Sequence, residues 1–187
     1  MFGIWYAKFN GAGWGNSVEV GIPGALSRCD NATAQRPAGC VFSNIPAVNS
    51  YSKTTVPDYV KHVDAAQLSG LPGRIGSGTV LHRLTSTAQQ DANRAKACPA
   101  SLPRPSGYSC DEYPMAATYE GASTGGGTLA RSFSFCRTMD PPRTGPTGWS
   151  RCMIPATQNS SASGTYNQFV RDARMLDADP FQIAFIP

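Results

Sequence analysis

Six cysteines constrain what this 187-residue chain can fold into more than any other feature of its sequence. Their number is even, and none belongs to a Cys-x-x-Cys motif. Because the chain has only two histidines, a zinc cluster is not expected, and the cysteines indicate disulfide bonds. Six cysteines can pair in several ways. Short loops favour the sequential pairing, Cys29 with Cys40, Cys98 with Cys110, and Cys136 with Cys152. Disulfide bonds indicate an oxidising compartment, so we expect a secreted protein.

The length and composition predict a single domain, residues 1–187, with a core of its own. Glycine and proline are abundant, which favours turns and short elements. The net charge is +4, and arginine supplies twelve of the 16 basic residues. Arginine suits bidentate phosphate contacts, so this charge is compatible with a polyanionic substrate without requiring one.

No stretch reaches the length of a transmembrane helix, so we expect no membrane insertion. The first residues lack the charged and apolar regions of a signal peptide. We therefore expect either that a signal has been removed or that the chain is one domain of a longer exported protein.

An acidic stretch at residues 109–121 is the strongest candidate for chemistry. It contains Asp111, Glu112 and Glu120, three of the chain's 12 acidic residues. On an extended strand, neighbouring side chains point to opposite faces, so at most one of Asp111 and Glu112 should face a given pocket. A carboxylate on a strand anchored by a disulfide can act as a general base or a metal ligand. The alternative is a charged turn without a chemical role.

Apolar periodicity predicts helices at residues 58–69 and 164–175 and a strand at residues 128–135. Several alanines and a cap at Thr85 or Ser86 predict a helix at residues 85–97. We expect further strands at residues 107–119, 149–157 and 181–186. The last helix carries Asn167, Arg171 and Arg174 on its polar side. His62 and His82 are single histidines, which are more often structural than catalytic.

Several short segments resemble one known family. They are Cys-Asp-Glu-Tyr-Pro-Met-Ala at 110–116, Tyr-Glu-Gly at 119–121, Gly-Trp-Ser-Arg-Cys-Met-Ile-Pro-Ala at 148–156, Gln-Asn at 158–159, and Arg-Met-Leu-Asp-Ala-Asp-Pro-Phe at 174–181. In this order they resemble the signature of the NucA/NucB family of secreted, non-specific deoxyribonucleases, over roughly residues 80–187. The resemblance implies an α+β fold with a small mixed sheet and a ββα-metal nuclease core. A disulfide-braced half, residues 1–106, would pack on a catalytic core, residues 107–187.

The resemblance also implies roles for individual residues. Asp111 would be the general base, and Glu112 either supports it or is itself the base. Asn159 would be the first metal ligand, with Asn167 or Gln168 as the second, and the ion would be magnesium or manganese. Arg151, Arg171 and Arg174 are candidate contacts to phosphate, and each could equally be a solvated surface residue.

The sequence therefore predicts a secreted, metal-dependent endonuclease that cleaves DNA with little sequence specificity and acts as a monomer. One alternative is a nuclease toxin domain of a larger exported protein, which an immunity or inhibitor protein would neutralise. Others are a non-catalytic, disulfide-rich module that binds nucleic acid or another polyanion, and a structural extracellular domain.

Overall fold

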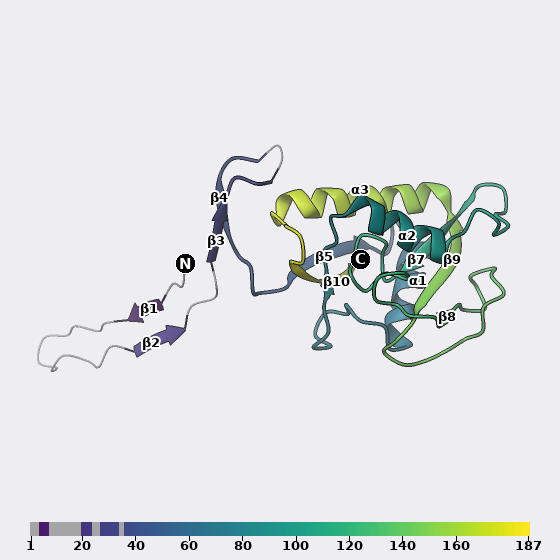
Figure 1. The fold of residues 1–187 in the computed structure, drawn as a ribbon, viewed down its shortest axis with the longest axis horizontal. Helices are drawn as coiled ribbons and strands as arrows, with labels where there is room; N and C mark the ends of the chain where they lie inside the picture. Colours follow the sequence, from purple (N-terminus) through teal and green to yellow (C-terminus); the bar gives the residue numbers. More distant parts are fainter. Residues whose placement is uncertain (1–3, 8–19, 24–26, 34–35) are drawn as a thin grey trace, which may run out of the picture.

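The computed structural model describes residues 4–7, 20–23, 27–33 and 36–187 (Figure 1). Two antiparallel hairpins lie outside the main body. The first pairs β1 (Ile4–Ala7) with β2 (Val20–Pro23). The second pairs β3 (Ser27–Asp30) with β4 (Gly39–Phe42), and the Cys29–Cys40 disulfide closes it at paired positions.

A ββα unit forms the centre of the main body. Strand β7 (Tyr108–Tyr113) pairs antiparallel with β9 (Trp149–Pro155), with Asp111 opposite Cys152 and Glu112 opposite Arg151. Helix α3 (Ala156–Asp172) follows β9 without a loop. This arrangement confirms the α+β fold class with its small mixed sheet.

Helix α3 begins eight residues earlier than the predicted start at residue 164. The small residues at 160–164 are helical because tertiary contacts outweigh their weak helix propensity. Ala162 is 2% exposed against the core, and Asn159 donates hydrogen bonds to β7. As a result, Asn159 lies in the first turn of the helix rather than before it.

A second sheet pairs the last strand of the chain with strands from its first half. Strand β10 (Pro180–Ile186) runs parallel to β5 (Ala47–Ser52) and antiparallel to β6 (Leu81–His82). Helix α1 (Pro57–Leu68) packs on the ββα unit. One hydrophobic core contains residues from both sides of residue 107, including Val60, Val63, Tyr113, Ile154 and Phe181.

The predicted disulfide pairing is confirmed: Cys29–Cys40, Cys98–Cys110 and Cys136–Cys152. Helix α2 (Thr87–Ala97) begins after Ser86, whose side chain accepts a hydrogen bond from the Gln89 backbone N–H and caps the helix. Cys98 follows the helix directly, so its disulfide to Cys110 ties α2 to β7.

The strand predicted at residues 128–135 is much shorter in the structure, where β8 contains only Ala130–Arg131 and runs parallel to β9. Arg131 is 1% exposed and points into the protein. Its guanidinium donates to backbone carbonyls of Ser69, Gly145 and Thr147. The buried arginine thus joins the loop after α1 to the loop before β9, which alternation along a strand could not predict.

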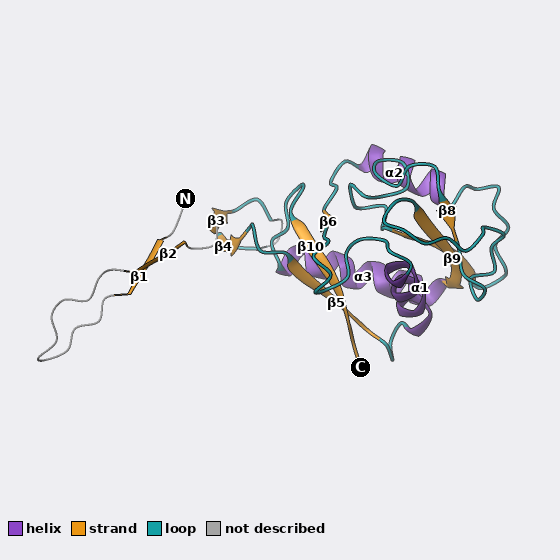
Figure 2. Cartoon of the chain, turned by 90° about the horizontal axis from the view of Figure 1, so that it is seen from below, coloured by secondary structure: helices purple, strands orange, loops and turns teal. Residues whose placement is uncertain are grey.

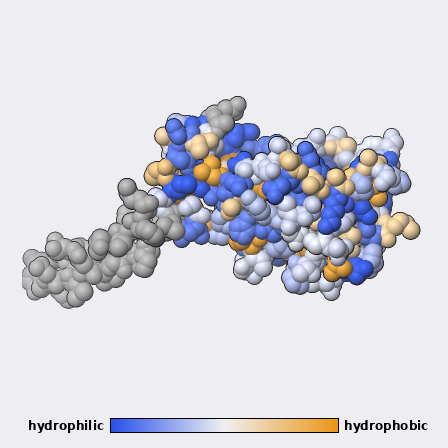
Figure 3. Space-filling model, viewed as in Figure 1, coloured by the Kyte–Doolittle hydropathy of each residue, from blue (hydrophilic) through white to orange (hydrophobic). Residues whose placement is uncertain are grey.

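Hydrophobic side chains on the face seen in Figure 3 are scattered over the described residues rather than gathered in one broad patch. None of the helices in the described part of the chain is long and apolar enough to span a membrane.

Candidate active-site cleft

A cleft of about 570 Å³ runs along β7, between α2 and α3. The two helices are separated in Figure 2, with α2 above α3. Strand β7 is an edge strand of its sheet, so a cleft along its free edge is open to side chains from both faces of the strand. Four consecutive β7 residues, Ser109 to Glu112, line the cleft. The expectation that only one of Asp111 and Glu112 could face a pocket was therefore wrong.

Asp111 lies between the cleft and the core, and its side chain is largely buried. Its Oδ2 atom is 2.6 Å from Nδ1 of His62, which is fully buried on α1. Nε2 of His62 is 3.0 Å from Oγ of Ser150 on β9. His62 thus binds one carboxylate oxygen of Asp111 from the core side of the strand, and His62 itself is not part of the cleft wall.

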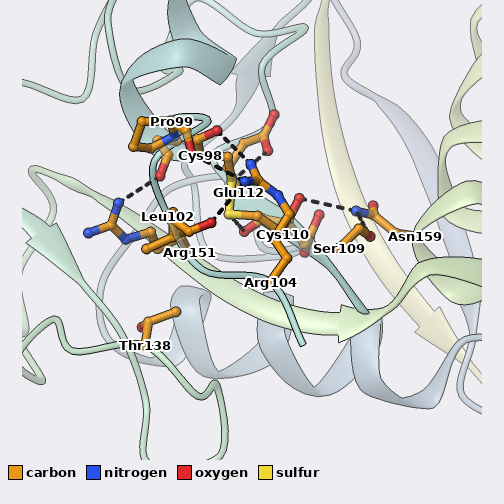
Figure 4. The surroundings of a disulfide bond; sticks show 12 residues. Cys98, Pro99, Leu102, Arg104, Ser109, Cys110, Glu112, Thr138, Arg151 and Asn159 are labelled. Atoms are coloured by element: carbon orange, nitrogen blue, oxygen red, sulfur yellow. Dashed lines mark hydrogen bonds between the residues drawn. A yellow bond between two sulfur atoms is a disulfide. The ribbon is translucent and has the colours of Figure 1, made fainter. Parts of the chain in front are cut away.

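Glu112 is partly buried in the same cleft, beside the Cys98–Cys110 disulfide (Figure 4). One carboxylate oxygen lies 3.6 Å from Sγ of Cys98. Burial, with a smaller contribution from the negative charge of Asp111, raises the pKa of Glu112 to about 7. A carboxyl group of this kind exchanges its proton near neutral pH.

Asn159 faces the cleft from the first turn of α3. Its Nδ2 donates to Oγ of Ser109 at 2.9 Å and to the Cys110 carbonyl at 3.2 Å (Figure 4). Because a carbonyl can only accept, the amide nitrogen must face β7. The Oδ1 atom of Asn159 is then left to bind a ligand in the cleft.

The two candidates for a second metal ligand have different positions. Asn167 lines the cleft, whereas Gln168 points away from it and donates to the carboxylate of Asp172. Asn167 is eight residues beyond Asn159, so the two lie roughly 12 Å apart along the helix axis. This is too far for both side chains to bind one ion, while Ser163, one turn from Asn159, also lines the cleft.

The donor atoms of the cleft fit a hard divalent cation. Asn159, Ser163, Asp111 and Glu112 offer only oxygen atoms, which magnesium and manganese prefer. A different cluster of potential ligands, His62 with Cys136 and Cys152, lies in the core. It cannot hold a metal through its sulfur atoms, because both cysteines are in a disulfide bond.

The three arginines predicted to contact phosphate lie outside the cleft walls. Arg151 makes a bidentate ion pair with Asp140 and donates to the Ala97 carbonyl. Arg171 donates to Gln168 on the outer side of α3.

Arg174 is buried at the base of the β3–β4 hairpin, where it donates to the carbonyls of Pro37 and Asp30. These contacts give each of the three arginines a structural role that needs no phosphate. Their positions argue against the predicted phosphate roles, above all for Arg174, which solvent barely reaches.

Two other arginines, Arg83 and Arg94, line the cleft and were not predicted from the sequence. Arg94 lies on α2, and among the described residues its hydrogen bonds go to Asp91 and Gln90 of the same helix, both through exposed contacts. Arg83 follows β6 and donates to the Met175 carbonyl. Their neighbours in the sequence do not indicate that these two arginines line a cleft, because their location depends on how α2 and β6 pack beside β7.

His62 was also missed, although its spacing carries a signal. Tyr59, His62, Val63 and Ala66 follow the i, i+3, i+4, i+7 pattern and are all buried. A histidine on the buried stripe of a helix needs polar partners in the core, and a carboxylate is a natural one.

Comparison with known families agrees with this geometry. Residues 76–184, more than half of the chain, match the family described as deoxyribonuclease NucA/NucB. The matched region contains β7, β9 and α3 together with Arg83 and Arg94. A comparison with curated protein sequences gave no significant match. The ββα unit, its cleft and the extent of this match together show that the chain belongs to the NucA/NucB family of deoxyribonucleases.

Proposed function

We propose that this protein is a secreted, metal-dependent endonuclease that hydrolyses DNA phosphodiester bonds with little sequence specificity. The observation that carries the proposal is the meeting of the Asp111 carboxylate and the Asn159 amide in one cleft that Arg83 and Arg94 also line. Membership of the NucA/NucB family supports DNA as the substrate. Three disulfide bonds support an extracellular location.

Asp111 is the general base in this proposal. Its Oδ2 atom is bound by His62, so Oδ1 accepts the proton of the attacking water. Glu112, whose pKa is raised to about 7, is suited to give a proton to the leaving oxygen. Two neighbouring carboxyl groups with different environments can thus divide the base and acid roles.

Asn159 would hold the divalent ion through Oδ1, with water molecules completing the coordination shell, as magnesium prefers. When bound, such an ion polarises the phosphate and stabilises the leaving oxygen. Arg83 and Arg94 attract the DNA backbone to the cleft. Contacts to phosphate carry no base information, which explains low sequence specificity.

Plasmid nicking with magnesium or manganese, with and without EDTA, tests this proposal. Asp111→Asn keeps the size of the side chain and removes the base, so we expect nicking to fall by about 10²–10⁴-fold. Asp64→Asn is the matched control, because Asp64 lies on the exposed side of α1 and pairs with Arg74. The control should cleave at the wild-type rate.

Other outcomes would change the proposal in defined ways. Full activity of Asp111→Asn would move the base to another residue, and Glu112→Gln would then be tested. Metal-independent cleavage would remove the ion from the mechanism. If the wild type with intact disulfides cleaved no DNA under any metal, the enzyme proposal would be wrong and a polyanion-binding module would replace it.

A further inference from the structure

The buried polar chain behind Asp111 is not explained by packing alone. His62 and Ser150 are both fully buried, on α1 and β9 respectively. A polar side chain in a core is unfavourable unless its hydrogen bonds are satisfied, and an apolar residue could fill the same space. Both ring nitrogens of His62 have partners, and the shorter contact, at 2.6 Å, is to the proposed base.

The direction of these hydrogen bonds follows when the Asp111 carboxylate is ionised, because an ionised carboxylate can only accept and Nδ1 must then carry a proton. Ser150 Oγ lies 3.0 Å from Nε2 of His62 and 3.3 Å from the Tyr113 carbonyl, which can only accept. If the serine proton goes to the carbonyl, Nε2–H donates to Oγ, and the ring carries protons on both nitrogens. If the serine proton goes to Nε2, the ring is neutral, with its proton on Nδ1. In both cases Nδ1–H donates to the ionised Asp111 carboxylate.

We propose that His62, held by Ser150, is a positioning residue that orients the Asp111 carboxylate, so that one oxygen is fixed in the core and the other faces the cleft. This inference rests on the proposed function of Asp111 as general base. A base must lie within hydrogen-bonding reach of the proton that it removes, and small displacements reduce rates strongly. Helix α1 lies outside the segment matched by the family, which begins at residue 76. The preceding part of the chain would therefore contribute to the site through a buried contact.

Two substitutions of His62 separate orientation from packing. Asn places its amide N–H near the position of Nδ1, whereas Gln places it near the position of Nε2. His62→Asn thus keeps a donor toward Asp111, and His62→Gln keeps only the contact toward Ser150. We expect His62→Gln to lower kcat by about 10–100-fold with KM changed less than about threefold. His62→Asn should keep most of the wild-type kcat.

His82 provides the matched control within the same chain. Its Nδ1 is 2.7 Å from a carboxylate oxygen of Glu120, so it forms the same kind of pair, but it is half exposed and lies outside the cleft wall. His82→Gln should therefore leave kcat unchanged. A merely structural role for His62 predicts instead that kcat follows the loss of melting temperature in both His62 variants.

Nuclear magnetic resonance of the ring nitrogens gives a readout that does not depend on activity. In the metal-free wild type, the buried histidine should carry a proton on Nδ1 and show a correlation to Asp111, while the exposed His82 exchanges rapidly. A bare Nδ1 would overturn the inference, and so would full kcat in His62→Gln. An inactive wild type would instead overturn the proposed function, which the Nδ1 proton does not test.

Discussion

Arginine and aspartate side chains have different roles in two regions of this molecule, the junction of the β3–β4 hairpin and the cleft. At the junction of the β3–β4 hairpin with the main body, Nη1 of Arg28 donates to both carboxylate oxygens of Asp179, and Nη2 donates to the Arg174 carbonyl. Arg174 in turn is bound by Asp30 and by backbone carbonyls. In the cleft, the hydrogen bonds of Arg94 within the described part of the chain go to Asp91 and Gln90 on its own helix, through exposed contacts.

The difference lies in how easily a ligand can replace the existing partners. The guanidinium groups at the junction already donate to several acceptors, and a phosphate would have to displace those acceptors. Exposed ion pairs within one helix are worth little and exchange readily with water. Arginine count and position in the sequence therefore do not identify a phosphate site, whereas the partners in the folded protein do.

After Asp111→Asn, the largest effect on the cleft side should come from Asn159→Ala. It removes the Oδ1 atom proposed to bind the metal, so we expect cleavage to fall on the order of 10²–10³-fold, as when one preorganised polar group is lost from an active site. Stability should fall by only about 1 kcal/mol, because two partly buried hydrogen bonds are lost. Cleavage rates over a manganese titration, with thermal unfolding in parallel, measure both.

Asn167→Ala is the matched control on the same face of α3. It should reduce cleavage only slightly, since Asn167 lies too far along the helix to share an ion with Asn159. Equal losses in the two variants would contradict the assignment of the metal to Asn159.

On the junction side, Arg174→Ala should reduce the free energy of unfolding by about 2 kcal/mol, because it leaves the Pro37 and Asp30 carbonyls without their charged donor, while the Asp30 carboxylate keeps its ion pair with Arg28. Cleavage by the folded variant should stay within about twofold of wild type. Urea unfolding followed by fluorescence measures the change, and Arg171→Ala, on the outer side of α3, should alter stability by less than about 0.5 kcal/mol. A loss of cleavage without a loss of stability would restore the phosphate role of Arg174.

Glu112→Gln should stabilise the protein in a pH-dependent way. The pKa of Glu112 is raised from 4.5 to about 7 in the folded state, so the folded protein binds the proton more tightly than the unfolded chain does. The stability contributed by Glu112 is therefore present below pH 4.5 and is lost as the pH rises through 7.

The Gln side chain cannot ionise. The difference in free energy of unfolding between the variant and the wild type should therefore be about 1–2 kcal/mol larger, in favour of the variant, at pH 8 than at pH 5. In the same series, wild-type cleavage should decline above pH 7 as Glu112 loses its proton, and the Gln variant should show low cleavage without this decline. Denaturant unfolding and rate profiles across this range measure both. A constant difference in stability between pH 5 and pH 8 would contradict the buried, raised pKa.

Arg94→Ala should produce the smallest effect, an increase of about three- to tenfold in KM with little change in kcat. It should also reduce the slope of log affinity against log salt by about one, because one phosphate contact is lost. Lys96→Ala removes the same charge from the same helix, but Lys96 lies outside the cleft wall and donates to the Gly127 carbonyl. If both substitutions weaken binding equally, the effect is one of net charge and the cleft contact is disproved.

Much of the fold and part of the candidate site could be predicted from local patterns. Short loops between cysteines were enough for the disulfide pairing, apolar periodicity located α1, and alanine content with a cap located α2. The strand that carries Asp111 was predicted at residues 107–119 and is shorter in the structure, Tyr108–Tyr113. The Cys-Asp-Glu-Tyr-Pro segment and Gln158-Asn159 led to Asp111 and Asn159, which the structure brings to one cleft. Local rules failed at the start of α3 and at β8, where buried contacts of Ala162 and Arg131 outweigh them.

By itself, the sequence determined the chemical groups available, the disulfide framework and the order of the ββα unit, since these depend on residue type and on neighbours along the chain. Only the tertiary structure decided which side chains meet. It placed His62 behind Asp111 from 49 residues away and set Arg83 and Arg94 in the cleft. It also gave Arg151 and Arg174 hydrogen-bond partners within the protein, Asp140 and the Asp30 carbonyl. The physical reason is that hydrogen bonding and burial act between surfaces brought together by packing, and periodicity along one element does not specify its partner.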